Sequence, residues 1–335
     1  MKKFVTMIMK GLQLFANELQ TTLLDGLSVE KKTFYDMTLS DEAQASLVHD
    51  QFAQKRPIPK NSGKTIEFRK FASLPKAMTP LTEGVTPDGK SLNVTAITAT
   101  VAQYGDYITQ SDVLELTTID NTIVEATKLL GRPAGLTLDT VTRNVLQSGT
   151  NVPYCPKVAA DGTETAVTSR AGLDNTCQLN VKVIQQVVAK LRAQIAQTIN
   201  GKYFAIAHPY AMYDLMRDPE WIEAHKYAKP DNLYEGEVGE IAGVRFVQTS
   251  EAKIYEGGVF GTLIMGEGAY GVTEITGGGL QTIVKQKGSA GTADPLDQRS
   301  SVGWKAIKTA ELLIPNYLVR VESKSAVFSS TAAAN

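Results

Sequence analysis

The sequence has 335 residues, of which 43% are hydrophobic, and its 34 basic residues nearly balance its 35 acidic ones. This length predicts about two domains, and the hydrophobic content is sufficient for a folded core. The balanced charge excludes a global field that would attract nucleic acid or an acidic membrane, so any contact with DNA must be local.

The cysteines and the hydropathy restrict the class of protein further. Cys155 and Cys177 are the only cysteines. Their spacing indicates neither a disulfide framework nor a zinc site, so we expect two incidental thiols in a reducing compartment. No segment has the ~20 apolar residues needed to cross a bilayer, so no membrane location is predicted.

The first residues, MKKFVTMIMKGLQLFANEL, resemble a signal peptide because lysines precede an apolar run. Lys10 interrupts that run, and no small-residue cleavage site follows. Apolar residues recur instead at helical spacing, which favours an amphipathic arm (Phe4, Ile8, Leu12, Phe15, Leu19 and Leu23). The mixed, polar segment from Ser28 to Gln54 is expected to wrap over another surface.

Two strands are predicted after this arm. Residues 64–71 (KTIEFRKF) alternate between polar and apolar, and residues 91–108 form a longer candidate strand. The apolar residues of the longer strand change face near Ala96, which indicates a bulge or a strong twist. The connection between the strands is too long for a tight hairpin, so the pair is expected to project. Two alternatives remain open: the pair lies on a neighbouring copy of the chain, or it packs on its own domain.

The most regular pattern runs from Ile119 to Gly149. Its apolar residues form one helical stripe (Ile119, Ile123, Ala126, Leu130, Ala134, Leu138, Val141 and Val145). Thr118 is expected to cap the start of this helix, and Gly149 to end it in a left-handed turn. Pro133 costs ~3 kcal/mol in a helix interior, so either the helix kinks or two helices abut. Because the stripe keeps its register, one kinked helix of ~45 Å is favoured.

The second half of the sequence predicts a small α+β domain after a turn-rich passage and a boundary near Ala171. A helix is expected from Leu179 to Ile199, ended by Asn200-Gly201, then a buried strand at 202–207 and a helix after His208-Pro209. This order predicts a sheet sandwiched by helices. Further strands are expected at 239–248, 259–265, 280–286, 306–313 and 317–321, and the tail SSTAAAN is expected to be loose.

No pattern in the sequence supports a catalytic, cofactor-binding or metal-binding residue. Gly266 to Gly271 matches the GxGxxG motif of dinucleotide sites, but the β-branched and glycine-rich stretch that follows is unsuited to a helix. Turns between strands explain these glycines better. His49, His208 and His225 lack metal-ligand spacing, and His208 is expected at a helix start, where it can meet free amides. We therefore expect a non-enzymatic protein that functions through the surface it presents.

Three segments in this order resemble the major capsid (coat) protein family of tailed double-stranded DNA bacteriophages: FAIAHPYAMYDLMRDPEWIEA, EGEVGEIAGVRFVQTSEA and DPLDQRSSVGWKAIKTAELLIPNYLVRVES. The resemblance covers most of Lys64 to Ser323 and implies an α+β fold, the tailed-phage major capsid (Johnson) fold. Five parts are implied: an N-terminal arm (1–56), an extended two-stranded loop or β-hairpin (57–109), a peripheral domain with a long spine helix (110–170), an axial domain (171–290), and strands returning to the peripheral domain with a C-terminal tail (291–335).

The resemblance also implies a function. It predicts a structural subunit that assembles into rings of five and six and then into an icosahedral shell around the phage genome, in the virion, after assembly in the bacterial cytoplasm. The expected partners are copies of itself in hexameric and pentameric capsomers, separate scaffold and portal proteins, and DNA held weakly without sequence preference. No cofactor is expected. Two alternatives remain: a nanocompartment shell of the same fold around a cargo enzyme and, more distantly, a nucleotide-binding enzyme that uses Gly266 to Gly271.

Overall fold

A computed structural model describes residues 37, 39, 42–43, 47–71, 74, 76–81, 83–86, 88–118, 122–159, 161–226, 239–289 and 294–335. These residues belong to two compact units. One unit contains residues 105–134 and 280–305 with the described residues up to Ala43, and the other contains the described parts of 44–104, 135–279 and 306–335. Within these ranges no helix is both long enough and apolar enough to cross a membrane. The predicted amphipathic helix of the arm lies outside the described residues.

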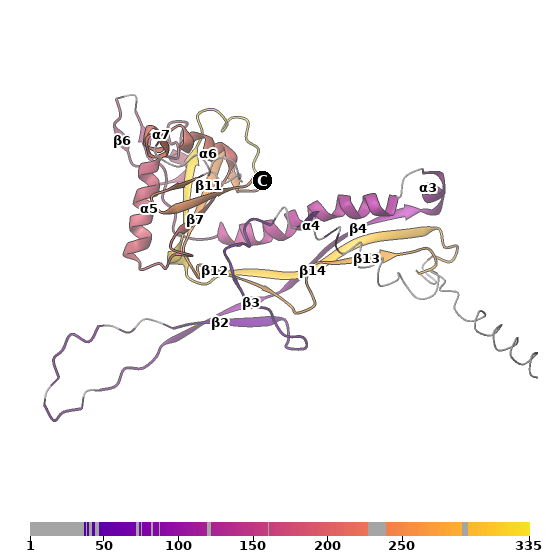
Figure 1. Cartoon of the computed structure of the whole chain (residues 1–335), viewed down its shortest axis with the longest axis horizontal. Coiled ribbons are helices and arrows are strands. Elements are labelled where there is room, and N and C mark those ends of the chain that lie inside the picture. The colour runs from indigo at the N-terminus through magenta and orange to yellow at the C-terminus, as the bar shows by residue number, and fades with distance from the viewer. Residues whose placement is uncertain are drawn as a thin grey trace, which may run out of the picture. The chain divides into compact units, whose positions relative to one another are not determined.

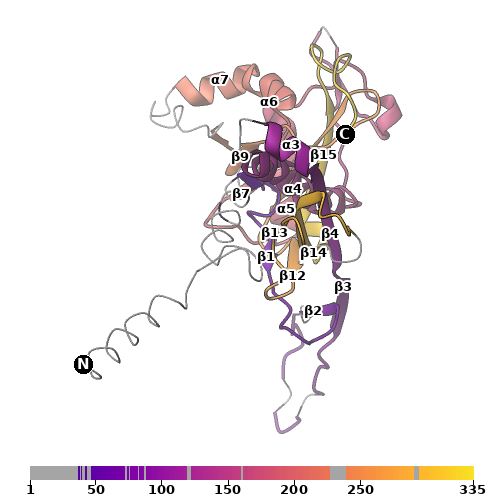
Figure 2. The ribbon, with the colours of Figure 1, turned by 90° about the vertical axis from the view of Figure 1, so that its right-hand side faces the viewer.

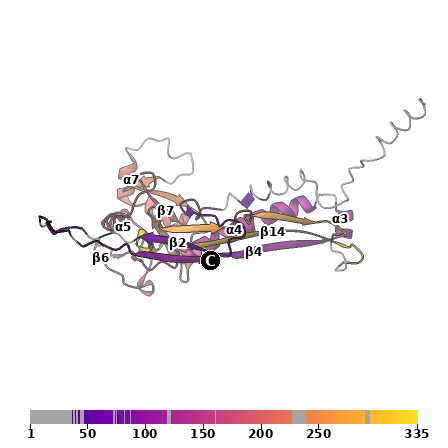
Figure 3. The ribbon, with the colours of Figure 1, turned by 90° about the horizontal axis from the view of Figure 1, so that it is seen from below.

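The first unit is built on the first part of strand β14 (Arg299–Leu312). Strand β13 (Gln281–Lys285) pairs antiparallel with β14, and β4 (Ala102–Ser111) also pairs with it; Figure 3 shows β4 and β14 side by side. β14 begins at Arg299, earlier than the predicted start at Ala306. Ser300, Val302 and Trp304 are buried in this first part of the strand, at the two-residue spacing of one strand face.

A short helix, α3 (Asp112–Thr117), follows β4. The hydroxyl of Ser111 accepts a hydrogen bond from the backbone N–H of Leu114 at 3.3 Å, so Ser111 caps this helix. Thr118 closes α3 by donating its own N–H to the carbonyl of Leu114. The prediction that Thr118 caps the start of the long helix is therefore wrong, because Thr118 ends this separate short helix instead.

The long helix is one helix, as the unbroken apolar stripe predicted. α4 (Thr122–Leu146) has 25 residues with Pro133 in its interior, which corresponds to a length of ~37 Å. Gly131 serves close packing, since a Cβ there would lie 2.7 Å from Cβ of Glu42. The helix ends at Leu146, and Gly149 is not left-handed, so the predicted glycine cap is wrong.

The second unit contains a six-stranded sheet. Five of its strands follow the order β10 (Ile254–Tyr255), β11 (Val259–Met265), β7 (Tyr203–Ala207), β9 (Val244–Gln248) and β8 (Glu240–Ile241). The sixth strand, β15 (Leu318–Lys324), also pairs with β11. β7 is parallel to β9 and antiparallel to β11, and β11 is antiparallel to β15. β7 and β11 are buried along their whole length, as the apolar runs predicted.

Three helices pack on one face of this sheet: α5 (Val181–Ala193), α6 (Pro209–Met216) and α7 (Pro219–Lys226) (Figure 1). Tyr203, Ala205 and Ala207 of β7 join the core beneath these helices. Phe204 and Ile206 point to the other face, where they cluster with the end of α4 and with strands rather than with a second layer of helices. The prediction of a sheet sandwiched by helices holds on one face only.

Helix α5 is shorter than predicted. It ends at Ala193, and the turn around Ile195 replaces the last part of the predicted helix. Asn200 and Gly201 both have positive φ and form a tight turn that joins Ile199 to Lys202. The helix predicted after His208-Pro209 is likewise two helices, separated between Met216 and Pro219.

The remaining strands of the second unit pair outside this six-stranded sheet. β12 (Tyr270–Glu274) pairs antiparallel with the end of β14 and parallel with β1 (Gln54–Lys55). β2 (Thr65–Phe71) and β3 (Val94–Thr100) form an antiparallel ribbon, and β5 (Lys157–Val158) pairs with β6 (Glu164–Thr165). Short 3-10 helices occupy Arg170–Gly172 and Pro315–Tyr317. Figures 1 and 2 show the ribbon continuing into its long loop.

The C-terminal segment is docked, which corrects the prediction of a loose tail. The ring of Phe328 stacks on Tyr210 with centroids 4.2 Å apart, and the hydroxyl of Ser329 donates to the carbonyl of Gly258 at 2.7 Å. Asn335 Oδ1 accepts a hydrogen bond from the N–H of Ile254 at 2.9 Å. The strand before this segment, β15, pairs antiparallel with β11.

Candidate assembly surface

The base of the ribbon packs on its own unit. Phe68 of β2 and Ala99 of β3 are buried together with Leu313, just after β14. Gly271 of β12 allows this contact, since a Cβ there would lie 2.9 Å from the Phe68 ring. Of the two alternatives left open by the sequence, packing on the own domain therefore applies to this half of the ribbon.

The other apolar face of the ribbon and its loop meets solvent. We define the ribbon-tip surface by six exposed apolar side chains (Leu74, Met78, Leu81, Val85, Leu92 and Val94). Met78 and Leu81 are 81% and 77% exposed. A row of large apolar side chains this exposed marks a surface made for contact.

The apolar side chains of β3 change from one face of the ribbon to the other near Ala96. The pairing of β2 with β3 is continuous from Thr65 opposite Thr100 to Phe71 opposite Val94, so the predicted bulge is absent from the ribbon. Before Ala96 the apolar side chains face solvent, and after it they face the unit's own core. The apolar side chains before and after Ala96 therefore lie on opposite faces of the ribbon, one in solvent and one against the unit's own core.

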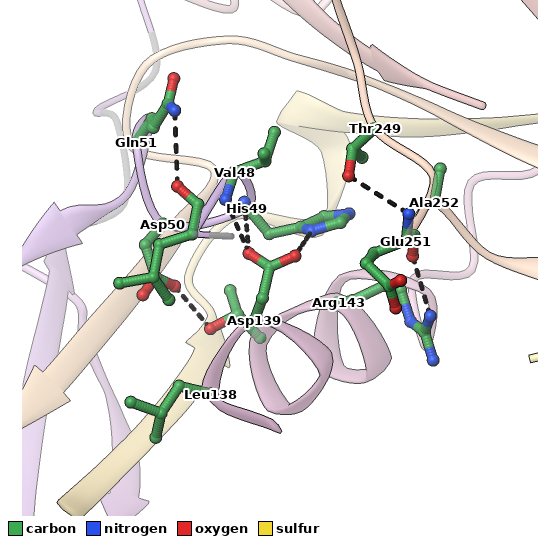
Figure 4. A network of polar contacts seen from close by, with 12 residues as sticks. Val48, His49, Asp50, Gln51, Leu138, Asp139, Arg143, Thr249, Glu251 and Ala252 are labelled. Atoms are coloured by element: carbon green, nitrogen blue, oxygen red, sulfur yellow. Dashed lines mark hydrogen bonds and ion pairs between the residues drawn. The ribbon is translucent and has the colours of Figure 1, made fainter. Parts of the chain in front are cut away.

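The segment that leads into the ribbon is fixed to α4 by a buried carboxylate (Figure 4). Asp139 Oδ1 accepts hydrogen bonds from the N–H groups of Val48 and His49 at 2.9 and 2.8 Å, and its Oδ2 lies 2.6 Å from Nδ1 of His49. His49 and Asp139 are both fully buried. Tyr270 donates its hydroxyl to the carbonyl of His49, and burial raises the pKa of that phenol.

A second buried contact extends this anchor. Asp50 accepts a hydrogen bond from the hydroxyl of Thr142 at 2.6 Å and forms an ion pair with Lys308 of β14. Lys308 also donates to the carbonyl of Leu138 at 3.0 Å. On the same helix, Arg143 donates to the carbonyl of Glu251 at 2.8 Å, and burial lowers the pKa of its guanidinium. The polar groups are thus paired across segments, which is what burial of charge requires.

Sequence reasoning missed these residues as a group, although a signal was present. Asp139, Thr142 and Arg143 recur at spacings of three and four in α4, so they share one face beside the apolar stripe. A polar stripe on a buried helix needs partners from elsewhere in the chain. Only the fold identifies Val48, His49 and Asp50 as those partners.

The stretch from Gly266 to Gly271 does not have the geometry of a dinucleotide site. Gly266 to Gly271 joins β11 to β12, and the strand β12 stands where a dinucleotide site needs a helix N-terminus. His208 accepts a hydrogen bond from the N–H of Tyr210 at 3.2 Å and caps α6, as predicted. The side chain of His225 lies outside the described residues.

Among the described residues no cluster of three metal-ligating side chains occurs. Cys155 and Cys177 are free and buried, and desolvation raises the pKa of both thiols. A thiol held in its neutral form is a poor nucleophile and a poor metal ligand.

Comparison with known proteins adds a fold. No protein-family model matches the chain, and no curated protein matches it. Among solved structures, the capsid of the cyanophage P-SCSP1u is similar with a TM-score of 0.64 and 12% identity, over 83% of this chain and 88% of that chain. The capsid asymmetric unit of cyanophage Pam1 gives 0.63 and 13%, over 86% and 93%. A virus-like particle from Pyrococcus furiosus gives 0.50 and 10%, over 88% and 100%. The chain therefore has the α+β fold of tailed-phage capsid proteins, as the resemblance implied.

Proposed function

We propose that the protein is a major capsid subunit, which assembles with copies of itself into the icosahedral shell of a tailed phage. The observation that carries this proposal is the ribbon-tip surface, a row of exposed apolar side chains on a chain with the capsid fold. A lone two-stranded ribbon is marginal in water, so a contact beyond the subunit would stabilise it. The missing half of that contact is a neighbouring copy.

Association of this kind is head to tail. The ribbon of one subunit covers a different surface on the next, and such heterologous contacts close into rings when the rotation between subunits allows it. Rings of five and six would then combine into a closed shell. Each contact can be modest, because a subunit in a shell is held by several contacts at once.

The finer assignments belong to the same proposal. Residues 1–56 would form the arm, 57–109 the extended loop, 110–170 the peripheral domain with α4 as its spine helix, and 171–290 the axial domain, with 291–335 completing the subunit. Separate scaffold and portal proteins would direct assembly, and packaged DNA would be held by weak, sequence-independent contacts. The near-neutral formal charge of −1 supports assembly of many copies, since it limits the electrostatic repulsion among them.

Deletion of Leu74 to Lys90 tests the proposal. The base of the ribbon keeps its own core, so the shortened subunit should stay folded and soluble, with circular dichroism and an unfolding midpoint close to the wild type. Electron microscopy should show particles for the wild type and none for the deletion. Particles of normal size from the deleted protein, or its failure to fold, would contradict the role given to the ribbon tip.

Point variants make the same test without shortening the chain. Met78→Ser combined with Leu81→Ser removes two apolar contacts from the tip, whereas Glu83→Gln changes an exposed polar residue of the same loop. We expect the double variant to need a concentration about tenfold or more above that of the wild type for half assembly. Glu83→Gln serves as the matched control and should assemble normally.

A nanocompartment shell is the second candidate, favoured by the similarity to the Pyrococcus furiosus virus-like particle. The contents of particles purified from the native source decide between the two functions. A capsid should contain double-stranded DNA protected from nuclease, and a nanocompartment should contain a cargo protein. The nucleotide-binding alternative predicts nucleotide binding by the subunit that Gly268→Val abolishes, and we expect no binding by either protein.

A further inference from the structure

Ile195 combines two unfavourable features at one position. Its backbone has φ of 57°, in the left-handed region, and its side chain is 81% exposed. A β-branched residue is a genuine outlier there, because its Cβ substituents crowd the backbone. Exposure of a large apolar side chain adds a second cost, so local folding gives no reason for isoleucine here.

The geometry around Ile195 is that of a regular helix end. The N–H of Ala196 donates to the carbonyl of Leu191 at 3.0 Å, and the N–H of Ile195 donates to the carbonyl of Arg192 at 3.0 Å. These two bonds define a Schellman motif with Ile195 at the position that glycine usually occupies. Glycine would form the same turn without strain.

Comparison within the chain supports this view. The other non-glycine residues with positive φ in the described part of the chain are Asn61, Asn200, Ala242 and Asp297. Asparagine and aspartate tolerate this conformation, and alanine has no branch at Cβ. Ile195 is the β-branched exception among the described residues.

The segment that carries Ile195 is held firmly in place. Tyr203 donates its hydroxyl to the carbonyl of Ala196 at 3.0 Å, and the N–H of Glu267 donates to the carbonyl of Gln197 at 2.8 Å. Ile199 and Lys202 exchange backbone hydrogen bonds across the following turn. The exposed side chain is thus presented from a fixed backbone, which lowers the entropy lost when it is buried by a partner.

The segment after this side chain lines a cavity. Gln197 and Ile199 line this space of about 530 Å³ together with the apolar side chains of Phe52, Ile314 and Tyr317 and the polar side chains of Gln51, Gln54 and Glu267. The segment from Gln194 to Asn200 (QIAQTIN) carries no charged side chain. The turn that presents Ile195 is therefore itself uncharged, which suits burial of this side chain against an apolar surface.

We propose that Ile195 is an anchor that a second copy of this chain buries on assembly. This inference rests on the proposed function, and the occupant follows from it: the chain itself supplies exposed apolar surface, in the ribbon tip above all. The strain and the exposure are costs borne by the free subunit, and burial between copies compensates both. The helix end is then a contact site whose residue is unfavourable for the subunit and favourable for the shell.

The test separates subunit stability from assembly in purified full-length protein, with no other protein present. Ile195→Gly and Ile195→Asn should raise the thermal midpoint of the dilute, unassembled subunit by about 2 °C, because strain is relieved. The same variants should raise the subunit concentration for half assembly about tenfold, measured by light scattering. Ile195→Leu keeps an apolar anchor and should assemble within about twofold of the wild type.

Asn200→Gly is the matched control, since it changes another residue of positive φ nearby without removing an apolar side chain, and both measurements should stay near the wild type. Wild-type assembly by Ile195→Gly would overturn the inference, as would a lower thermal midpoint of its subunit. If only the presence of a different protein exposes a defect, the partner is not a second copy. Absence of particles from the wild type, both alone and with a scaffold protein present, would instead overturn the proposed function, and the inference with it.

Discussion

The imidazole Nδ1 of His49 lies 2.6 Å from the carboxylate Oδ2 of Asp139, although the two residues stand 90 positions apart in the sequence. The contact ties the segment before the ribbon to the middle of α4, in a place from which water is excluded. A carboxylate in such a place is stable only while its hydrogen bonds are complete. Removal of one partner should therefore cost more free energy of unfolding than the loss of one contact.

We expect Asp139→Ala to lower the free energy of unfolding by about 3–5 kcal/mol, because it leaves His49 and two backbone N–H groups without their acceptor. Urea unfolding of the isolated subunit measures this change. Lys128→Ala on the same helix removes only an exposed pair with Glu125 and should change the stability by less than about 0.5 kcal/mol. Equal effects of the two substitutions would show that the buried carboxylate does not fix the segment.

Two adjacent leucines on α4 should respond in opposite ways to a charge. Leu130 is 4% exposed and Leu129 is 69% exposed. Leu130→Asp buries an unpaired carboxylate and should destabilise the subunit by at least about 4 kcal/mol, enough to unfold a marginal domain. Leu129→Asp should leave the stability of the free subunit within about 0.5 kcal/mol of the wild type. Circular dichroism during urea titration compares the two variants directly.

The two apolar faces of the ribbon predict different results from similar substitutions. Phe68→Ala opens a cavity in the ribbon's own core and should cost about 3–5 kcal/mol of subunit stability. Leu92→Ser lies on the exposed face and should cost less than about 0.5 kcal/mol in the free subunit, while it weakens assembly. A large loss of subunit stability in Leu92→Ser would place that side chain in the subunit's own core.

Acid should weaken the cap of α6. Burial lowers the pKa of the His208 imidazole below its ordinary value of 6.5, and Nδ1 accepts the Tyr210 N–H only while it is unprotonated. Because the folded state has the lower pKa, the unfolded chain binds the proton first as the pH falls. The contribution of His208 to stability is therefore present above pH 6.5 and is lost as the pH falls from there toward the folded-state pKa.

Asparagine at position 208 keeps a capping acceptor and does not titrate. We expect His208→Asn to lose less free energy of unfolding than the wild type between about pH 7.5 and about pH 5. Asp214, which is buried, and Glu311, which is half-buried, have pKa values raised by desolvation; both titrate in the two proteins and cancel in the comparison. Parallel pH profiles of the two proteins would exclude a titrating cap.

Much of the local structure could be predicted from the sequence. The stripe in α4, the alternation in β2 and the apolar runs of β7 and β11 reflect how a regular backbone repeats its side-chain directions. A cap residue was predicted where the signal was standard, as for His208. The end of α5 was misjudged because isoleucine stands at Ile195 in place of the usual glycine.

The candidate site was predictable in part. The ribbon and its loop followed from alternation and from the prolines and glycines between the strands. The change of face near Ala96 predicted a bulge or a strong twist, and the strands pair through it without a bulge. The change of face was visible in Leu92, Val94 and Ile97, yet only the packing of Phe68 against Leu313 shows which face is covered. Sequence periodicity shows which side chains share a face of a strand, but it does not show which segment covers that face.

The sequence by itself determined the elements of this protein, because the periods of helix and strand are set by local backbone geometry. The tertiary structure decided the rest: that β15 joins β11, that Asp139 receives His49, and that the ribbon tip and Ile195 remain uncovered. These outcomes depend on which surfaces come together at close packing and on which polar groups must find partners there. Such choices are made between distant segments, and no local pattern encodes them.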